Sequence, residues 1–348
     1  MYDTPPNHDY LWMMRAVELA RQGQGTTSPN PPVGAVIVRD GILLGEGYHQ
    51  IAGEPHAERL AIANAIFKGN AEAMRGATIY VTLEPCSSYG RTPPCTEAII
   101  EAGIARVVYG AVDPDERHRG RADEILRAHG IAVESGVCAG VCEILVRPWA
   151  WSVKHRRPWV LAKVATTMDG RMTRRDDRWL SSPKALRNAH QLRLESDAIL
   201  VGGGTVRIDD PALTIRTPLQ TPSPRKKQPY RIVLTQNRDS IPADCMLLTD
   251  QYADRTLIIE SVSDFQAMLE ELYSKYGIVN LLLECGGRLL RRFLEEGLVN
   301  EWVQDIAPIL GGGPAPMVPG DYLKRECRFK EEEILACEPD IILRGILE

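Results

Sequence analysis

Two short stretches decide the fold of the N-terminal half: residues 55–59 read PHAER, and residues 82–95 read TLEPCSSYGRTPPC. The first stretch places a histidine two residues before a glutamate, directly after a proline. Proline is favoured in the first turn of a helix, so Pro55 predicts a helix start. Side chains two residues apart face different sides further along a helix. In the first turn, however, both His56 and Glu58 can reach a ligand that lies off the helix end.

The second stretch repeats this arrangement with cysteines. Cys86 follows a strand-like segment, and Cys95 follows Pro94 at another predicted helix start. Helix N-termini favour the thiolate, which is the form that binds metal. Together with His56, the two cysteines make a three-ligand zinc site with a fourth position open. Structural zinc normally takes four protein ligands and catalytic zinc keeps a position for water, so we predict a catalytic site with Glu58 as its proton carrier.

The combination is more specific than its parts. A lone His-x-Glu is ordinarily only a helix start, but two Pro-Cys dipeptides at element junctions reverse that interpretation. Zinc-dependent deaminases of nucleobases carry H-x-E followed by P-C-x-x-C, and their glutamate acts as acid and base without binding metal. Here the segment SSYGRTPP separates the cysteines instead of two residues.

Length and composition bound the class of protein. A domain usually contains about 150 residues, so a chain of 348 residues predicts two domains. With 44% hydrophobic and 25% charged residues, the chain fits an ordinary globular protein. The net charge of −5 argues against a protein that coats nucleic acid non-specifically, because such a protein normally has a basic surface. No apolar stretch approaches the roughly 20 residues that span a bilayer, and the N-terminus lacks the pattern of a signal peptide, so we expect a cytoplasmic protein.

Both halves show the alternation of strand-like and helix-like segments that predicts an α/β fold. The first half, residues 9–145, begins with a helix and a hairpin, and its order suggests a three-layer α/β/α sandwich. Residues 146–158 read VRPWAWSVKHRRP and suit the start of a linker. We therefore predict two domains, residues 1–147 and 148–348.

The glycines and the remaining cysteines carry weaker signals. No G-x-G-x-x-G follows a strand, so a Rossmann cofactor site is not supported. The turns GGGT (202–205) and CGGR (285–288) can bring backbone N–H groups close to phosphate, although such turns more often serve packing. Six cysteines lack a histidine at metal-ligand spacing and are interpreted as packing residues: Cys138, Cys142, Cys245, Cys285, Cys327 and Cys337.

The long loop between the two metal-site cysteines resembles the deaminase domain of the RibD family of bifunctional riboflavin-biosynthesis proteins. TTSPNPPVGAVIV (26–38) and GEGYHQIAGEPHAE (45–58) agree with that family. Further on, RPWVLAKVATTMDG (157–170) and RLESDAILVGGGTVRIDDPALTIR (193–216) resemble its reductase domain. The resemblance covers nearly the whole chain. It implies a cytidine-deaminase-like domain followed by a dihydrofolate-reductase-like α/β domain.

The resemblance also implies the reactions of both domains and the site residues of the first. The family's deaminase acts on 2,5-diamino-6-(5-phosphoribosylamino)pyrimidin-4(3H)-one, and its reductase then uses NADPH to convert the ribosyl group to ribityl. One zinc ion per chain is implied on His56, Cys86 and Cys95, with Glu58 as the proton shuttle. Substrate contacts are implied for Asn30, His49, Arg91 and Asp113.

In the second domain the resemblance assigns two sets of contacts. NADPH contacts are implied for Ala165, Trp179, Thr205, Asp209, Gly286 and Gly287. Substrate contacts are implied for Arg193, Leu213, Arg216 and Glu284, with Asp177 where a small hydroxyl residue typically touches the substrate. Lys163 and Asp209 are the candidates for catalytic polar assistance, because hydride transfer needs orientation and charge placement more than a nucleophile. We further expect a small-molecule enzyme that forms a homo-oligomer, a dimer or a tetramer, without nucleic-acid or membrane partners.

Several residues depart from the family pattern and keep alternatives open. Ser88 stands where histidine is usual, Asp115 replaces an amide, and Cys285 and Arg288 alter the second glycine turn. One alternative is an active deaminase with a non-catalytic, reductase-like scaffold. Another is an enzyme that catalyses the same reactions in secondary metabolism. A nucleic-acid-editing deaminase is disfavoured by the pI near 5.9 and by the lack of interleaved aromatic and basic residues.

Overall fold

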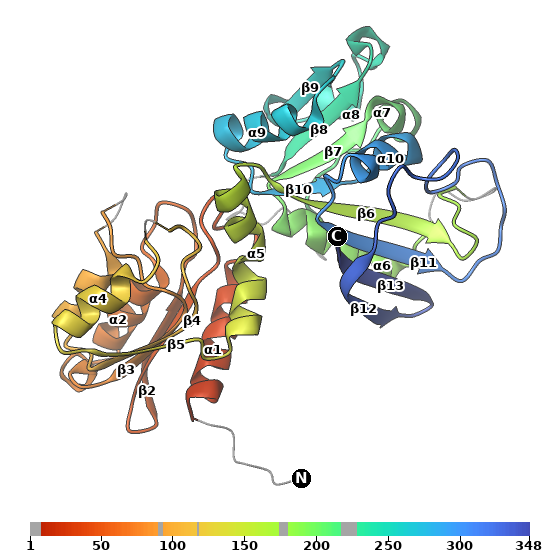
Figure 1. Ribbon diagram of the computed structural model, residues 1–348. Coiled ribbons are helices and arrows are strands. Elements are labelled where there is room, and N and C mark those ends of the chain that lie inside the picture. The colour runs from red at the N-terminus through yellow and green to blue at the C-terminus, as the bar shows by residue number, and fades with distance from the viewer. Residues whose placement is uncertain (1–7, 90–92, 117, 174–179, 217–227) are drawn as a thin grey trace, which may run out of the picture. The chain divides into compact units, whose positions relative to one another are not determined.

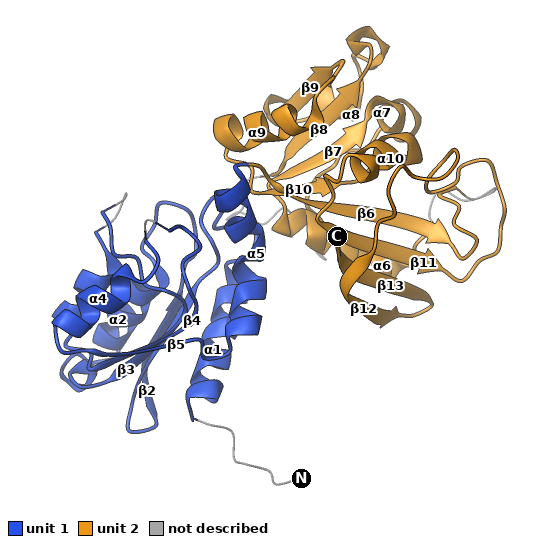
Figure 2. Ribbon diagram, in the orientation of Figure 1, with its two compact units in different colours: residues 1–156 blue, residues 157–348 orange. Residues whose placement is uncertain are grey.

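The structure is a computed structural model that describes residues 8–89, 93–116, 118–173, 180–216 and 228–348. The chain divides into two compact units, residues 1–156 and 157–348 (Figure 2). Each unit contains one β-sheet with helices packed on it (Figure 1), which confirms the α/β class for both halves. Among the described helices, none combines the length and the apolar character needed to cross a bilayer.

The N-terminal unit is built on a five-stranded sheet in the order β2-β1-β3-β4-β5. Its strands are β1 (Gly34–Arg39), β2 (Ile42–Tyr48), β3 (Thr78–Leu83), β4 (Arg106–Ala111) and β5 (Ala132–Ser135). Its helices are α1 (His8–Gln22), α2 (Ala57–Phe67), the short 3-10 helix η1 (Glu72–Met74), α3 (Cys95–Glu101), α4 (Arg121–Ala128) and α5 (Ala139–His155). The β1-β2 hairpin turns at Asp40 and Gly41, whose positive φ values of 50° and 76° suit an Asp-Gly turn.

Alternation along the strands produces the predicted three layers. Ile37, Ile79 and Val107 face a core that they share with α2, α3 and α4. Their neighbours Val36 and Val108 point to the opposite face, where α1 and α5 pack. Because successive strand side chains point to opposite faces, a sheet whose two sides are both apolar must be covered on both sides, and helices cover both sides here.

Helix α5 occupies the segment in which we expected a linker to begin. Residues 139–155 are helical and include Pro148. Cys142, Leu145 and Val146 are buried at helical spacing against the sheet, which explains why the segment folds as a helix despite its proline. The predicted boundary between residues 147 and 148 falls inside this helix and stays a prediction.

The C-terminal unit is built on an eight-stranded sheet in the order β12-β13-β11-β6-β10-β7-β8-β9. Neighbouring strands from β11 to β9 in this order pair in parallel, and β13 and β12 are antiparallel additions at one edge. The strands are β6 (Trp159–Thr167), β7 (Ala198–Gly202), β8 (Tyr230–Thr235), β9 (Thr256–Glu260), β10 (Asn280–Leu283), β11 (Glu301–Ala307), β12 (Phe329–Cys337) and β13 (Asp340–Leu347). The helices are α6 (Pro183–Glu195), α7 (Gly203–Asp209), α8 (Met246–Thr249), α9 (Phe265–Tyr276), α10 (Gly287–Glu295) and the 3-10 helices η2 (Arg238–Ser240) and η3 (Ala253–Arg255).

Two apolar clusters cover the faces of this second sheet. One joins the strands to α9 and α10 through Leu269 and Phe293, and the other joins them to α6 and α8 through Leu192 and Leu247. Of the six cysteines interpreted as packing residues, four are buried and two are half-buried. The parallel strands bring their carboxyl ends to one edge, which is where ligands bind in open α/β sheets.

Candidate functional sites

Two helix starts and a strand end bring His56, Cys86 and Cys95 together. His56 is the N-cap of α2, Cys95 is the first residue of α3, and Cys86 follows β3. Nδ1 of His56 lies 3.5 Å from Sγ of Cys86 and 3.4 Å from Sγ of Cys95. Zinc bonds of about 2.0 Å to nitrogen and 2.3 Å to sulfur, at a tetrahedral angle, would separate these atoms by about 3.5 Å. The three donors, which lie within 4.8 Å of one another, therefore fit a tetrahedral zinc ion.

The pKa values of the two cysteines shift in opposite directions. A hydrogen bond from Cys95 and the nearby His56 lower the pKa of Cys86 to about 4, although burial opposes this shift. The same hydrogen bond, together with burial, raises the pKa of Cys95. The backbone N–H of Cys95 also donates to Sγ of Cys86 at 3.2 Å. Donors from the start of α3 therefore favour the thiolate form of Cys86.

Glu58 lies beside the three ligands in the first turn of α2. It is 3% exposed, and burial followed by the negative charge of Cys86 raises its pKa. Helix α2 begins at Ala57, two residues later than Pro55, because His56 has the extended dihedrals of an N-cap (φ −72°, ψ 167°). This geometry places His56 outside the hydrogen-bonded turns of α2 and leaves Glu58 in the first turn, at the N-terminal end of the helix, as predicted.

Two of the expected substrate residues form a chain of contacts next to His56. Nδ1 of His49 donates to the carbonyl oxygen of Pro55 at 3.2 Å, because a carbonyl can only accept. Nε2 of His49 then accepts from Nδ2 of Asn30 at 3.1 Å. Burial lowers the pKa of His49, in agreement with a neutral ring. The His49 and His56 rings meet edge to face, with centroids 5.3 Å apart.

Asp113 is held by a buried acid that the sequence analysis missed. Glu84, which is 4% exposed, accepts the backbone N–H of Asp113 at 3.1 Å and that of Ala122 at 3.4 Å. Oδ1 of Asp113 in turn accepts the N–H of Asp115 at 2.8 Å, and burial raises the pKa of Asp113. Glu84 thereby fixes the loop after β4. The available signal was a carboxylate at the end of an apolar strand, directly before Pro-Cys.

Lys163 in the C-terminal unit pairs with an acid that was also missed. Its Nζ lies 2.9 Å from Oδ2 of Asp305, and the two side chains are 11% and 2% exposed. Oγ of Ser181 reaches the same carboxylate oxygen at 3.4 Å. The pair connects the neighbouring parallel strands β6 and β11. An acid inside the apolar segment EWVQDIA was the signal for Asp305.

Two predicted substrate residues, Arg193 and Glu284, bind each other. Arg193 on α6 donates from Nε at 2.8 Å and from Nη2 at 2.6 Å to the two carboxylate oxygens of Glu284, just after β10. Burial acts to raise the pKa of Glu284, but Arg193 and the more distant charge of Lys163 lower it overall. The result is an ionised pair that shares one electrostatic environment with Lys163.

A cavity of about 440 Å³ opens at the carboxyl ends of β7 and β8. Its lining includes glycines 202–204, Thr235 and three arginines, Arg207, Arg288 and Arg292. No acidic side chain from the described ranges lines it. Guanidinium groups bind phosphate well, so the cavity fits part of a phosphate-bearing nucleotide. It adjoins both of the glycine turns that the sequence analysis singled out.

The two glycines of the second turn, Gly286 and Gly287, differ in the space that surrounds them. Gly286 is the N-cap of α10, and open space surrounds the place where its Cβ would lie. At Gly287, a Cβ would lie 2.7 Å from the carbonyl oxygen of Met317 and 2.8 Å from that of Pro316. Close backbone packing therefore explains Gly287, and its predicted cofactor contact stays a prediction.

The remaining predicted residues of the C-terminal unit lie on several elements. Ala165 is on β6, and Thr205 and Asp209 are on α7. Leu213 is buried, and Arg216 is exposed. Their contacts with ligands stay predictions. Three further predicted site residues lie outside the described ranges: Arg91, Asp177 and Trp179.

Family models match both units of the chain. The family model of the RibD C-terminal domain matches residues 158–343, and that of the cytidine and deoxycytidylate deaminase zinc-binding region matches residues 6–111. RibD of Escherichia coli is 38% identical, with 96% of this chain and 98% of the relative covered. RibD of Aquifex aeolicus is 38% identical, with 88% of each chain covered.

Solved structures extend the likeness to the full fold. Acinetobacter baumannii RibD is similar with a TM-score of 0.89 and 34% identity, covering 98% of this chain and 99% of that one. A Thermotoga maritima protein described as a diaminohydroxyphosphoribosylaminopyrimidine deaminase and 5-amino-6-(5-phosphoribosylamino)uracil reductase has a TM-score of 0.82 and 31% identity over the same shares. These likenesses confirm the resemblance inferred from the sequence. The chain therefore belongs to the RibD family and is a bifunctional deaminase and reductase of riboflavin biosynthesis.

Proposed function

We propose that the N-terminal unit removes an amino group from 2,5-diamino-6-(5-phosphoribosylamino)pyrimidin-4(3H)-one by hydrolysis. The C-terminal unit then reduces the ribosyl group of the product to ribityl with NADPH. The observation that carries the proposal is the convergence of His56, Cys86 and Cys95 beside the buried Glu58. The Thermotoga maritima relative, which is described by both activities, supports the pairing of the two reactions.

In the deaminase, one zinc ion held by His56, Cys86 and Cys95 would supply Lewis-acid activation of a water molecule. Glu58 takes a proton from that water, passes it to the ring nitrogen and later protonates the leaving amino group. The water oxygen becomes the carbonyl oxygen of the pyrimidine, and the amino nitrogen leaves as ammonia. The step needs no reductant.

The neighbouring polar groups orient the pyrimidine. Asn30 can present an amide edge to the pyrimidinone while it keeps its hydrogen bond to His49. Asp113, on the loop that Glu84 fixes, supplies a carboxylate for an exocyclic amine. Arg91 is the candidate cation for the substrate phosphate.

In the reductase, NADPH would supply a hydride equivalent to the sugar carbon that bears nitrogen. The cavity lined by Arg207, Arg288 and Arg292 suits the phosphates of the nucleotide. Lys163, held by Asp305, is the candidate donor of the proton that the sugar oxygen takes up as the ring opens. The chain's contribution is orientation and charge placement rather than covalent catalysis.

The proposal includes a small phosphorylated pyrimidine as substrate, a cytoplasmic setting, and assembly as a homodimer or homotetramer. The family membership supports these parts, and the substrate is the part that an activity test reaches directly. Size-exclusion chromatography with light scattering measures the assembly state.

The test is a two-step turnover experiment on the purified, zinc-loaded protein. The diaminopyrimidinone phosphoribosylamine is supplied with and without NADPH, and product mass is followed, with Glu58→Ala as the control. Deamination without NADPH, and reduction only on its addition, are expected in the wild type. Deamination that never proceeds to reduction would indicate a non-catalytic reductase scaffold. No turnover at all would contradict the proposed substrate.

A further inference from the structure

The loop of residues 210–216 in the C-terminal unit has an unusual backbone. Leu213 has φ 49° and Asp210 has φ 40°, both in the left-handed region, although neither residue is glycine. Non-glycine residues are unfavourable there and persist only where the surroundings hold them. The loop also carries two predicted substrate residues, Leu213 and Arg216, so the groups that hold it bear on substrate binding.

The first group is Arg231, a fully buried cation on β8 whose side chain is 1% exposed. Its Nη1 donates to the carbonyl oxygen of Ala212 at 3.1 Å, directly before Leu213. Its two Nη atoms donate to the carboxylate of Asp250 at 2.6 Å and 2.8 Å. Nη2 also donates to the carbonyl oxygen of Leu247 at 2.9 Å. Because the guanidinium is planar with fixed donor directions, these bonds set the position of the Ala212 carbonyl relative to the sheet.

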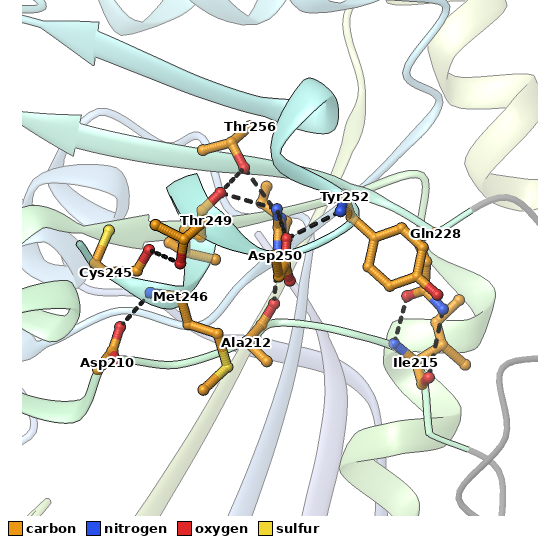
Figure 3. A network of polar contacts seen from close by, with 12 residues as sticks. Asp210, Ala212, Ile215, Gln228, Cys245, Met246, Thr249, Asp250, Tyr252 and Thr256 are labelled. Atoms are coloured by element: carbon orange, nitrogen blue, oxygen red, sulfur yellow. Dashed lines mark hydrogen bonds and ion pairs between the residues drawn. The ribbon is translucent and has the colours of Figure 1, made fainter. Parts of the chain in front are cut away.

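The second group is Gln228, which is 5% exposed and holds the other side of Leu213. Its Oε1 accepts the N–H of Ile215 at 2.7 Å, and its Nε2 lies 3.5 Å from the carbonyl oxygen of the same residue. Figure 3 shows Gln228 facing Ile215 on one side of the network and Asp210 facing Met246 on the other. Both flanks of the left-handed residue are thus fixed by buried side chains.

We propose that Gln228 and Arg231 are positioning residues of the reductase. They hold residues 212–215 in the conformation that presents the backbone of Leu213 and the side chain of Arg216 to the sugar phosphate of the substrate. This inference rests on the proposed function, which assigns those two residues to the substrate. Neither positioning residue touches the substrate itself, so their effect is on its binding rather than on hydride transfer.

Gln228 gives the cleaner test, because Arg231 also holds Asp250, Leu247 and Thr256. Within the described residues, the side chain of Gln228 bonds to Ile215 alone. In the full-length enzyme, Gln228→Leu keeps the volume and removes both bonds. We expect KM for the deaminated substrate to rise about tenfold, because the 2.7 Å bond to the N–H of Ile215 is the stronger of the two bonds lost, while kcat and KM for NADPH stay unchanged.

Two further variants separate positioning from general destabilisation. Gln228→Glu keeps an acceptor for the N–H of Ile215 but turns an oxygen toward the carbonyl of that residue, so it should recover part of the lost affinity. Thr249→Val removes a bond to the carbonyl of Cys245 in the same network without touching the loop, and should leave both KM values unchanged. An unchanged substrate KM in Gln228→Leu, or a rise in both KM values that follows a fall in Tm, would overturn the inference.

Arg216→Ala distinguishes failure of the inference from failure of the proposed function. If Arg216→Ala raises the substrate KM and Gln228→Leu does not, the positioning role is wrong and the assignment of Arg216 stands. If Gln228→Leu alone raises it, the loop acts through Leu213 and the inference holds. If neither variant changes it, both the loop assignment and the positioning role are wrong.

Discussion

The metal centre of the N-terminal unit and the polar site of the C-terminal unit are assembled in different ways. His56, Cys86 and Cys95 come from one short span of chain and are aimed by two helix starts and a strand end. In contrast, Lys163 and Asp305 meet only because β6 and β11 are neighbours in the sheet. The first site depends on residue type at a few positions, and the second depends on which strands pair. The two sites should therefore fail under different perturbations.

Metal removal should produce the largest difference between the units. Chelation is expected to abolish deamination, a loss of several orders of magnitude, because the activation of water disappears with the ion. Reduction of the already deaminated substrate should continue. Ammonia release and NADPH oxidation are measured on the same preparation, and added zinc should restore the first. A parallel loss of reduction would show that the two sites are not independent.

Asp305→Asn should break the C-terminal site selectively. The substitution leaves the Lys163 ammonium without its buried partner, which is a severe perturbation for a charge that is only 11% exposed. We expect kcat of reduction to fall about tenfold to a hundredfold, with deamination unchanged. Glu271→Gln, which removes the exposed pair with Lys275, is the matched control and should change neither rate. An equal loss of both activities would instead indicate unfolding.

The arginine-lined cavity predicts a preference for the phosphorylated dinucleotide. Arg207→Ala and Arg288→Ala should each weaken NADP⁺ binding about tenfold and weaken NAD⁺ binding less, because each removes a cation that suits a phosphate. Isothermal titration calorimetry gives both dissociation constants without turnover. Arg328→Ala, at an exposed pair with Glu326, serves as the control. Equal losses for the two dinucleotides would assign these arginines to the shared phosphates only.

The smallest effect concerns the acid stability of the N-terminal unit. Hydrogen bonds from Arg106 lower the pKa of Asp9 below its ordinary value of 3.8. A hydrogen bond from Tyr80 lowers it further, whereas burial acts to raise it. A depressed folded-state pKa stabilises the fold above the unfolded value and loses this contribution as the pH falls through the folded value. Asp9→Asn should lower the free energy of unfolding by about 1 kcal/mol at pH 7. Urea denaturation should show the two proteins converging in strong acid, and a constant difference would contradict the assignment.

The sequence predicted more of the first site than of the second. His56, Glu58, Cys86 and Cys95 could be selected because proline, ligand type and element junctions are all readable within a few residues. Glu84 was missed, although it lies two residues before a ligand, because its partners are backbone groups of a distant loop. The helix of residues 139–155 was also missed, since its proline and tryptophans suggested a linker, whereas packing of one apolar face decided the outcome.

What the sequence determined by itself was the class of fold, the two-part organisation and the candidate metal-binding set. These follow from local periodicity and from residue types whose chemistry is short-ranged. The tertiary structure decided which acid accompanies Lys163, that Arg193 and Glu284 bind each other, and how Gln228 and Arg231 hold a left-handed Leu213. The first two contacts join residues far apart in the chain, which strand order brings together, and the contacts of Gln228 and Arg231 depend on which side chains are buried, so no local pattern could predict them.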